Sequence, residues 1–216
     1  MTPLSDALSR FAGHRTILVA SDFDGTLADH RPELGATTPV PGAESALNQL
    51  SRLANVTAML VSGRRLADLL PRFDALAPEI VTVGEHGAEW PGVEPDVHPH
   101  VEVLAVGLEE ITAGIDRAIV ERKLFGVTLR HGAVEARRVE QLLDETTAYL
   151  RETVLDSVPR VEFGRGVIDV SLLATTTSDA VRTVKESAGA EAVLYFGDDV
   201  SDESVFELMG MSDVGV

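Results

Sequence analysis

TILVASDFDGTLADH, residues 16–30, is an apolar run that ends in two aspartates, Asp22 and Asp24. Residues 16–21 are rich in branched apolar side chains and lack alternation with polar ones, which predicts a strand buried on both faces of a parallel sheet. Two carboxylates at positions i and i+2 point to the same side, where like charges repel and desolvation is costly. We therefore expect a ligand beyond the end of this strand.

Further apolar runs of the same kind lie farther along the chain, with helical patterns between them. The predicted strands cover residues 16–21, 56–62, 79–85 and 191–198. The predicted helices cover residues 41–55, 64–78 and 178–189. Strands that alternate with helices indicate an α/β fold with a doubly wound, Rossmann-like parallel sheet as its core.

Residues 98–173 break this alternation. They are predicted to form a helix over residues 102–121, a strand over 124–131 and a long helix over 135–156. A hairpin of two strands, 160–163 and 166–173, is expected to follow. This order indicates a small inserted α+β cap domain between two parts of the core. The expected domains are 1–97 (core, first part), 98–173 (cap) and 174–216 (core, second part), with the Pro- and Gly-rich residues 89–100 as entry linker.

The composition limits the classes of function. The chain has 216 residues, 44% of them hydrophobic, which is enough to bury a sizeable core. Its 18 basic and 35 acidic residues give a formal net charge of -17, which disfavours nucleic acid and anionic membranes as partners. Cysteine is absent, and no apolar stretch has the length of a membrane span or the pattern of a signal peptide. We therefore expect a cytoplasmic protein without a nucleic-acid or membrane partner.

Polar residues stand at the carboxyl ends of three predicted strands, the edge where open parallel sheets bind ligands. They are Asp22, Asp24, Ser62, Asp198, Asp199 and Asp202. A single Asp or Ser after a strand is usually the N-cap of a helix. Carboxylates that converge on one edge need a divalent cation, and a set of oxygen ligands suits Mg²⁺.

The same residue types suit phosphate chemistry. One carboxylate of the pair after the first strand can attack phosphorus while the other handles the proton of the leaving oxygen. Gly25 lets the backbone turn sharply, and Thr26 offers a hydroxyl and an N–H group to phosphate oxygens. Ser62 can donate a hydrogen bond to the same phosphoryl group.

Three motifs, DFDGT (22–26), SGR (62–64) and GDDVSDE (197–203), resemble those of the haloacid dehalogenase superfamily of phosphatases in order and in position. The resemblance implies a phosphoric monoester hydrolase. Asp22 is expected to be the nucleophile that forms an aspartyl-phosphate, and Asp24 the general acid and base. The implied Mg²⁺ ligands are Asp22, the backbone carbonyl of Asp24, Asp198 and Asp202, with Asp199 as a further partner.

Two more segments resemble the trehalose-6-phosphate phosphatases. TVGEHGAEW (82–90) is similar to that family's Gly-x-His-Gly-Ala-Glu segment, and VERKLFGVTL (120–129) to its Glu-x-Lys segment in the cap. The resemblance implies a set of substrate-binding residues, namely Gly25, Thr26, Gly63, Arg64, His86, Glu121, Lys123 and Arg130. The alternative interpretations are a turn residue for His86 and a solvated helix end for Glu121 and Lys123.

The chain departs from these families at three places. The superfamily's lysine after the cap falls on Thr177 and Ser178, and Lys185 lies two helical turns later. The family's His-Tyr-Arg in the cap reads Arg-His-Gly at 130–132. The fold implies more helix and strand after the final strand at 213–216, so the C-terminal end of the core is expected to be short.

Two classes of function therefore stay open. The first is a Mg²⁺-dependent sugar-phosphate phosphatase, in which Arg64 or Arg165 compensates for the missing lysine. Its first expected substrate is trehalose 6-phosphate, and the alternatives are a related disaccharide phosphate, a glucosylglycerol- or glycerate-type phosphate, or a pseudo-disaccharide phosphate. The second class is a degenerate phosphatase-like domain that binds sugar phosphate or supports a partner synthase. The intact aspartates and Ser62 favour the enzyme.

Overall fold

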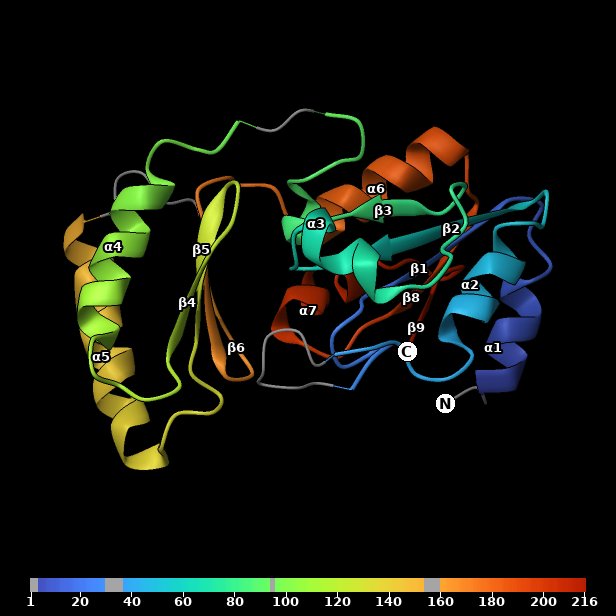
Figure 1. The fold of residues 1–216 in the computed structure, drawn as a ribbon. Coiled ribbons are helices and arrows are strands. Elements are labelled where there is room, and N and C mark those ends of the chain that lie inside the picture. The colour runs from blue at the N-terminus through green and yellow to red at the C-terminus, as the bar shows by residue number, and fades with distance from the viewer. Residues whose placement is uncertain (1–3, 30–36, 94–95, 154–159) are drawn as a thin grey trace. The chain divides into compact units, whose positions relative to one another are not determined.

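The computed structural model describes residues 4–29, 37–93, 96–153 and 160–216 (Figure 1). They divide into two compact units. The first contains residues 4–29, 37–93 and 175–216, and the second contains residues 96–153 and 160–174. The expected domain boundaries at 97/98 and 173/174 stay predictions.

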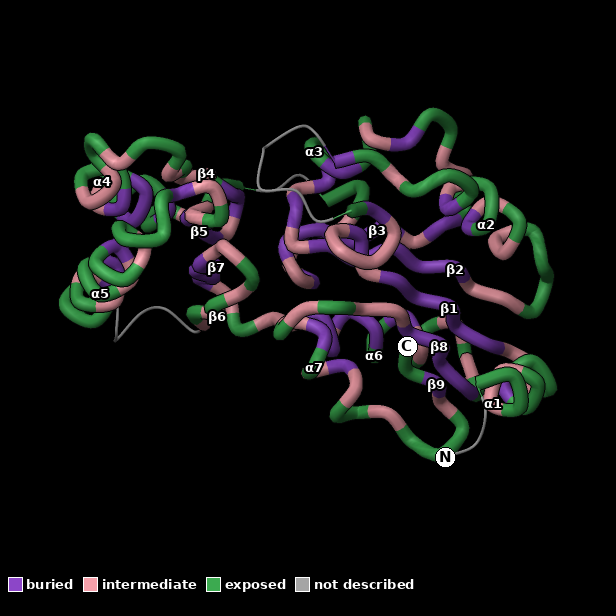
Figure 2. Tube along the Cα trace, turned by 90° about the horizontal axis from the view of Figure 1, so that it is seen from below, coloured by how far each residue is buried: buried purple, intermediate pink, exposed green. Residues whose placement is uncertain are grey.

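A five-stranded sheet forms the centre of the first unit. Its strand order is β3-β2-β1-β8-β9, and every neighbouring pair is parallel. The strands are β1 (Ile17–Ser21), β2 (Val56–Val61), β3 (Val81–Val83), β8 (Ala192–Phe196) and β9 (Val214–Gly215). β1 lies between β2 and β8 and is buried along its whole length (Figure 2), as its continuous apolar run predicts. Because all strands are parallel, their carboxyl ends meet at one edge.

Helices cover both faces of this sheet. One face packs against α6 (Thr177–Ala188) and α7 (Val200–Phe206). The other packs against α1 (Leu4–Phe11), α2 (Ala43–Leu50) and α3 (Leu66–Leu69). The short 3-10 helices η1 (Leu70–Arg72) and η2 (Glu85–Gly87) follow α3 and β3. The predicted doubly wound parallel sheet is confirmed.

The helix predicted over 64–78 is wrong in its length. α3 ends at Leu69, and the 3-10 turn that follows contains Pro71 and ends at Arg72. Proline has no N–H group and its ring crowds the preceding turn, so the α-helical hydrogen-bond pattern does not continue through it.

A four-stranded antiparallel sheet and two helices form the second unit (Figure 1). The strand order is β4-β5-β7-β6, with β4 (Ile119–Arg122), β5 (Gly126–Arg130), β6 (Arg160–Gly164) and β7 (Val167–Ser171). α4 (Val101–Thr112) and α5 (Ala136–Thr153) pack on one face of the sheet, over a core that includes Leu104, Leu129 and Ile168. Because strand side chains alternate, the intervening Thr128 and Asp169 lie on the opposite face.

The helix predicted over 102–121 is also too long. α4 ends at Thr112 because Ala113 leaves the helical conformation, with a ψ of 118°, and Gly114 and Arg117 then adopt positive φ angles of 78° and 64°. The chain continues into β4, whose pairing with β5 sets Glu121 opposite Thr128. The sequence interpretation missed this strand, which places Glu121 in a sheet instead of at a helix end.

The predicted fold class is confirmed as a parallel α/β core with a separate small α+β unit. Within the described residues, no helix combines the length and the apolar composition needed to cross a membrane.

Candidate active site

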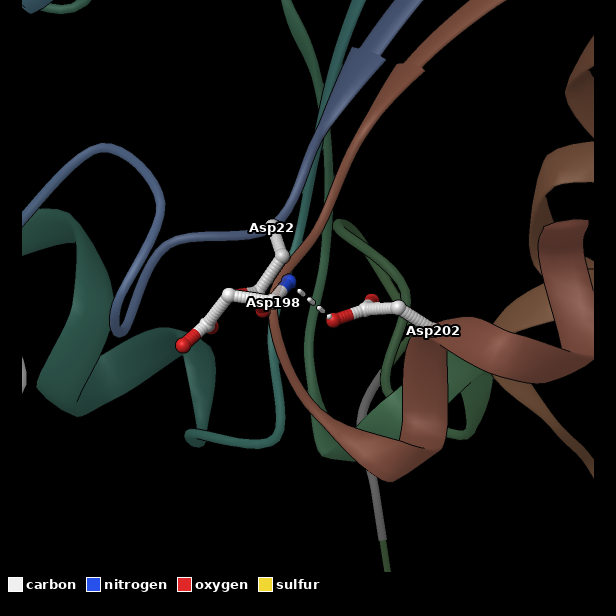
Figure 3. A group of neighbouring side chains, drawn as sticks. All are labelled: Asp22, Asp198 and Asp202. Carbon is white, nitrogen blue, oxygen red and sulfur yellow. Dashed lines mark hydrogen bonds between the residues drawn. The ribbon is translucent and has the colours of Figure 1, made fainter. Parts of the chain in front are cut away.

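Three aspartates meet at the carboxyl ends of β1 and β8 (Figure 3). Asp22 follows β1, Asp198 follows β8, and Asp202 lies in the first turn of α7. One carboxylate oxygen from each lies within 4.8 Å of the other two. The predicted convergence of these residues on one edge is therefore present, with Asp22 half-buried, Asp198 exposed and Asp202 buried.

Hydrogen bonds fix Asp202 in this group. Its Oδ2 accepts the backbone N–H groups of Asp198 and Asp199 at 3.0 and 3.1 Å, and its Oδ1 accepts the hydroxyl of Tyr195 at 2.5 Å. Asp199 itself is the N-cap of α7, and its side chain accepts the N–H of Val200 at 2.8 Å. Its carboxylate does not belong to the three-aspartate group.

The electrostatics of the three-aspartate group favour a cation. Burial, followed by the negative charges of Asp202, Asp24 and Asp198, raises the pKa of Asp22 well above its ordinary value. Burial also raises the pKa of Asp202, although the hydrogen bond from Tyr195 opposes the shift. These carboxylates supply only hard oxygen ligands, and a divalent cation would relieve their repulsion. The residues present therefore fit a metal ion.

Gly25 makes room for this arrangement. Its φ is +97°, and a Cβ atom built on it would lie 2.3 Å from both carboxylate oxygens of Asp198. Only glycine combines this backbone conformation with so close an approach. The glycine of the DFDGT motif therefore allows the turn after β1 and also the position of Asp198.

Asp24 points to a different partner. Arg64, at the start of the segment after β2, donates from Nε and Nη2 to Oδ2 and Oδ1 of Asp24, both at 2.6 Å. The Arg64 side chain is only 3% exposed, whereas that of Asp24 is 27% exposed. Arg64 was predicted to bind substrate, but these two donors are directed at the proposed acid and base.

Ser62, Gly63 and His86 lie together beside this pair. Ser62 is buried; its Oγ accepts the N–H of Arg64 at 3.1 Å, and its carbonyl accepts the N–H of His86 at 3.0 Å. A Cβ atom on Gly63 would lie 2.4 Å from Nε2 of His86, so the imidazole rests directly on this glycine. His86 has a φ of 54°, and such backbone strain in a residue other than glycine is typical of functional sites.

Thr26 also has a free hydroxyl in this unit. Its Oγ1 is buried and has no hydrogen-bond partner among the described residues. A buried polar atom without a partner costs free energy unless a ligand or water satisfies it. Thr26 therefore keeps the donor that its predicted role requires.

The second unit holds a polar cluster of its own. Lys123 is 6% exposed, and its Nζ lies 2.5 Å from Oδ1 of Asp169, which also accepts the hydroxyl of Thr128 at 2.5 Å. Glu121 accepts a hydrogen bond from Nε of Arg130 at 2.9 Å. Neither Glu121 nor Lys123 is a solvated helix end.

Comparison with known proteins identifies the family. The sequence model described as trehalose-phosphatase matches residues 20–214. The chain belongs to the trehalose-phosphatase family. It is 31% identical over 212 residues to the trehalose-phosphate phosphatase of Mycobacterium marinum, covering 90% of this chain and 52% of that protein. It is 30% identical over 239 residues to the trehalose-phosphate phosphatase of Mycobacterium leprae, covering 100% of this chain and 54% of that protein. The chain thus spans about half the length of the curated relatives it matches.

Solved structures agree on the fold of this trehalose-phosphatase family member. The C-terminal domain of the C. albicans trehalose-6-phosphate phosphatase matches with a TM-score of 0.81 and 19% identity, over 95% of this chain and 77% of that one. The sucrose-phosphatase of Synechocystis, solved with sucrose and phosphate, matches with a TM-score of 0.55 and 17% identity, over 94% of this chain and 92% of that one.

The position of the missing lysine is filled by a helix cap. Thr176 caps α6 together with Asp179, and the following Thr177 and Ser178 are buried. The lysine farther along this helix, Lys185, forms an ion pair with Asp213, with Nζ 3.2 Å from Oδ1. Arg165, the other candidate replacement, is exposed in the turn between β6 and β7 of the second unit.

The sequence interpretation missed several residues of these networks, namely Thr37, Thr128, Asp169 and Tyr195. Asp169 stands between the buried Ile168 and Val170, so a charge within an apolar strand was the available signal. Thr37 is buried and its Oγ1 accepts from Nη2 of Arg64 at 3.2 Å. No sequence pattern points to Thr37, because the contact depends on how distant segments meet.

Proposed function

We propose that this chain is a Mg²⁺-dependent phosphatase that hydrolyses trehalose 6-phosphate to trehalose and phosphate. The observation that carries the proposal is the group formed by Asp22, Asp198 and Asp202, whose carboxylate oxygens lie within 4.8 Å of one another at the sheet edge. Membership of the trehalose-phosphatase family supports the choice of substrate.

The proposed reaction has two steps. In the first, a carboxylate oxygen of Asp22 attacks phosphorus, the bond from phosphorus to the sugar oxygen breaks, and Asp24 gives a proton to that oxygen. In the second, water attacks the aspartyl-phosphate, Asp24 takes the water's proton, and Asp22 is released with inorganic phosphate. Thr26 and Ser62 would donate hydrogen bonds to the phosphoryl oxygens, beside the backbone of Gly25 and Gly63.

The metal would be held by Asp22 and Asp198, with Asp202 supporting the site from α7 and the backbone carbonyl of Asp24 as the further expected ligand. When bound, Mg²⁺ would neutralise part of the charge of the carboxylates and of the phosphate. Asp199 is better explained as the cap of α7.

Substrate choice is assigned to the second unit. Its polar sheet face, with Glu121, Lys123 and Arg130, offers both charged donors and carboxylate acceptors, which suit sugar hydroxyls. A related disaccharide phosphate, a glucosylglycerol- or glycerate-type phosphate and a pseudo-disaccharide phosphate are the competing substrates. We further propose a cytoplasmic protein that acts together with a sugar-phosphate synthase.

Phosphate release from this panel of sugar phosphates tests the function. We expect fastest release from trehalose 6-phosphate, loss of release with excess chelator, and recovery on adding Mg²⁺. Asp22→Asn should abolish turnover and leave the fold intact, because it removes the attacking charge and keeps the shape. Asp68→Asn, at an exposed position of α3, is the matched control and should keep full activity. Unchanged release from the Asp22→Asn variant would refute the covalent mechanism.

A binding-only domain is the second candidate, and the capped start of α6 favours it, since Thr177 and Ser178 provide no cation there. It predicts that trehalose 6-phosphate binds with Mg²⁺, measured by calorimetry, while no substrate of the panel releases phosphate.

A further inference from the structure

We propose that Arg64 is a positioning residue, which holds the carboxylate of Asp24 in the orientation that proton transfer requires. This inference rests on the proposed function, because it concerns the group that serves as acid and base there. It differs from the expectation that Arg64 binds the phosphate of the substrate.

The contact between the two side chains is bidentate. Nε and Nη2 of Arg64 each lie 2.6 Å from one carboxylate oxygen of Asp24, so the planar guanidinium faces the planar carboxylate along one edge. Two parallel hydrogen bonds of this kind fix the rotation of the carboxylate as well as its distance. A single contact would leave that rotation free.

Arg64 is itself held from several sides. Its N–H donates to Oγ of Ser62 at 3.1 Å, and its Nη2 donates to Oγ1 of Thr37 at 3.2 Å. The guanidinium carbon lies 5.9 Å from the centre of the Phe23 ring, a cation–π distance. With 3% of its side chain exposed, Arg64 is a fixed support and not a mobile surface cation.

The exposure of its side chain explains why Asp24 needs this support. Asp24 follows Asp22 by two residues, at the same end of β1 as the three-aspartate group. The Asp24 carboxylate is 27% exposed, so without a partner its side chain could rotate toward solvent. The two hydrogen bonds from Arg64 oppose that rotation and hold the carboxylate in one orientation.

Lysine does not have the geometry for this task. Its ammonium is a point charge without a fork of parallel donors, so it can neutralise Asp24 but cannot fix the rotation of its carboxylate. Arg64→Lys therefore separates charge from geometry. A misplacement of about 1 Å in a catalytic group costs about a hundredfold in rate.

The test compares Arg64→Lys with Arg65→Lys in steady-state assays of trehalose 6-phosphate and an aryl phosphate. Arg65 is the adjacent arginine, is 33% exposed, and lies 3.9 Å from Glu85 instead of Asp24. We expect Arg64→Lys to lower kcat about a hundredfold for both substrates, with KM and the inhibition constant of inorganic phosphate changed less than about threefold. Arg65→Lys should keep kcat within about threefold.

A rise of about tenfold or more in KM and in the phosphate inhibition constant at unchanged kcat would overturn the proposal and make Arg64 a phosphate ligand. Unchanged kinetics in Arg64→Lys would also overturn it. If only trehalose 6-phosphate fails as a substrate, the proposed sugar specificity is wrong, and the aryl phosphate still decides the role of Arg64. If neither substrate is hydrolysed by the native protein, the function and the positioning role both fail.

A stability measurement keeps the ion pair itself testable in every case. Thermal melting of Arg64→Gln, Asp24→Asn and the double variant should show coupling between the two residues. The fall in Tm of the double variant should be at least about 3 °C smaller than the sum of the falls in the two single variants. Additive effects would show that the pair does not form in solution, which would overturn the proposal irrespective of activity.

Discussion

Replacing Gly25 by alanine should dismantle the cation site without removing any of its ligands. The new Cβ would lie 2.3 Å from both carboxylate oxygens of Asp198, whereas an ordinary contact starts near 3.4 Å. The carboxylate must therefore retreat by about 1 Å, a displacement that costs about a hundredfold in rate when it affects a catalytic group. The φ of +97° adds backbone strain of about 1–3 kcal/mol.

Gly42 provides a matched control for the strain. Its φ is +94°, and a Cβ atom built on it meets nothing within 4 Å. Gly42→Ala should therefore carry the strain of a positive φ, as Gly25→Ala does, with a fall in Tm of about 2–12 °C, but without moving Asp198. The difference between the two variants isolates the effect of displacing the carboxylate.

Two measurements are needed for both variants. Calorimetric titration with Mg²⁺ alone reports the cation site in the absence of any substrate, and phosphate release from trehalose 6-phosphate reports turnover. We expect Gly25→Ala to lose Mg²⁺ affinity and about a hundredfold in turnover, and Gly42→Ala to retain both. If Gly25→Ala binds Mg²⁺ as tightly as Gly42→Ala, the reasoning that links this glycine to the metal site is wrong.

Two other predictions concern stability. Lys123→Ala should lower the free energy of unfolding, measured by urea unfolding, by about 3–5 kcal/mol, because Asp169 stays buried without its cation. The double variant Lys123→Ala with Asp169→Ala should recover part of this loss. A loss below about 1 kcal/mol in the single variant would contradict the buried ion pair. Thr176→Ala should cost about 1 kcal/mol at neutral pH, because it removes the cap of α6. The hydrogen bond from the Thr176 hydroxyl is the first cause that lowers the pKa of Asp179. The contribution of this capping pair is therefore present above the ordinary aspartate pKa of about 4 and is lost as the pH falls through the lower folded-state value. Melting curves should therefore show a smaller difference in Tm between Thr176→Ala and the native chain at acid pH than at neutral pH. An equal difference in Tm at both pH values would contradict this contribution of the capping pair.

The sequence by itself determined the core sheet and the place of its reactive groups. Apolar runs without alternation identify β1, β2, β3 and β8 as buried parallel strands, and parallel strands present their carboxyl ends at one edge. Any polar residue directly after such a strand is therefore placed by the topology alone. This is why the positions of Asp22, Ser62 and Asp198 could be predicted without knowledge of a single side-chain contact.

Only the tertiary structure decided which of these groups are partners. The contact between Arg64 and Asp24 joins residues 40 positions apart, and the contact between Lys123 and Asp169 joins residues 46 positions apart. The second contact depends on β4, a strand whose residues carry a helical pattern in the sequence and which forms because β5 supplies a neighbour. Long-range strand pairing outweighs the local preference of residues for helix or strand. Sequence patterns can therefore place reactive residues at the ends of helices and strands, whereas strand register and packing determine which side chains contact one another.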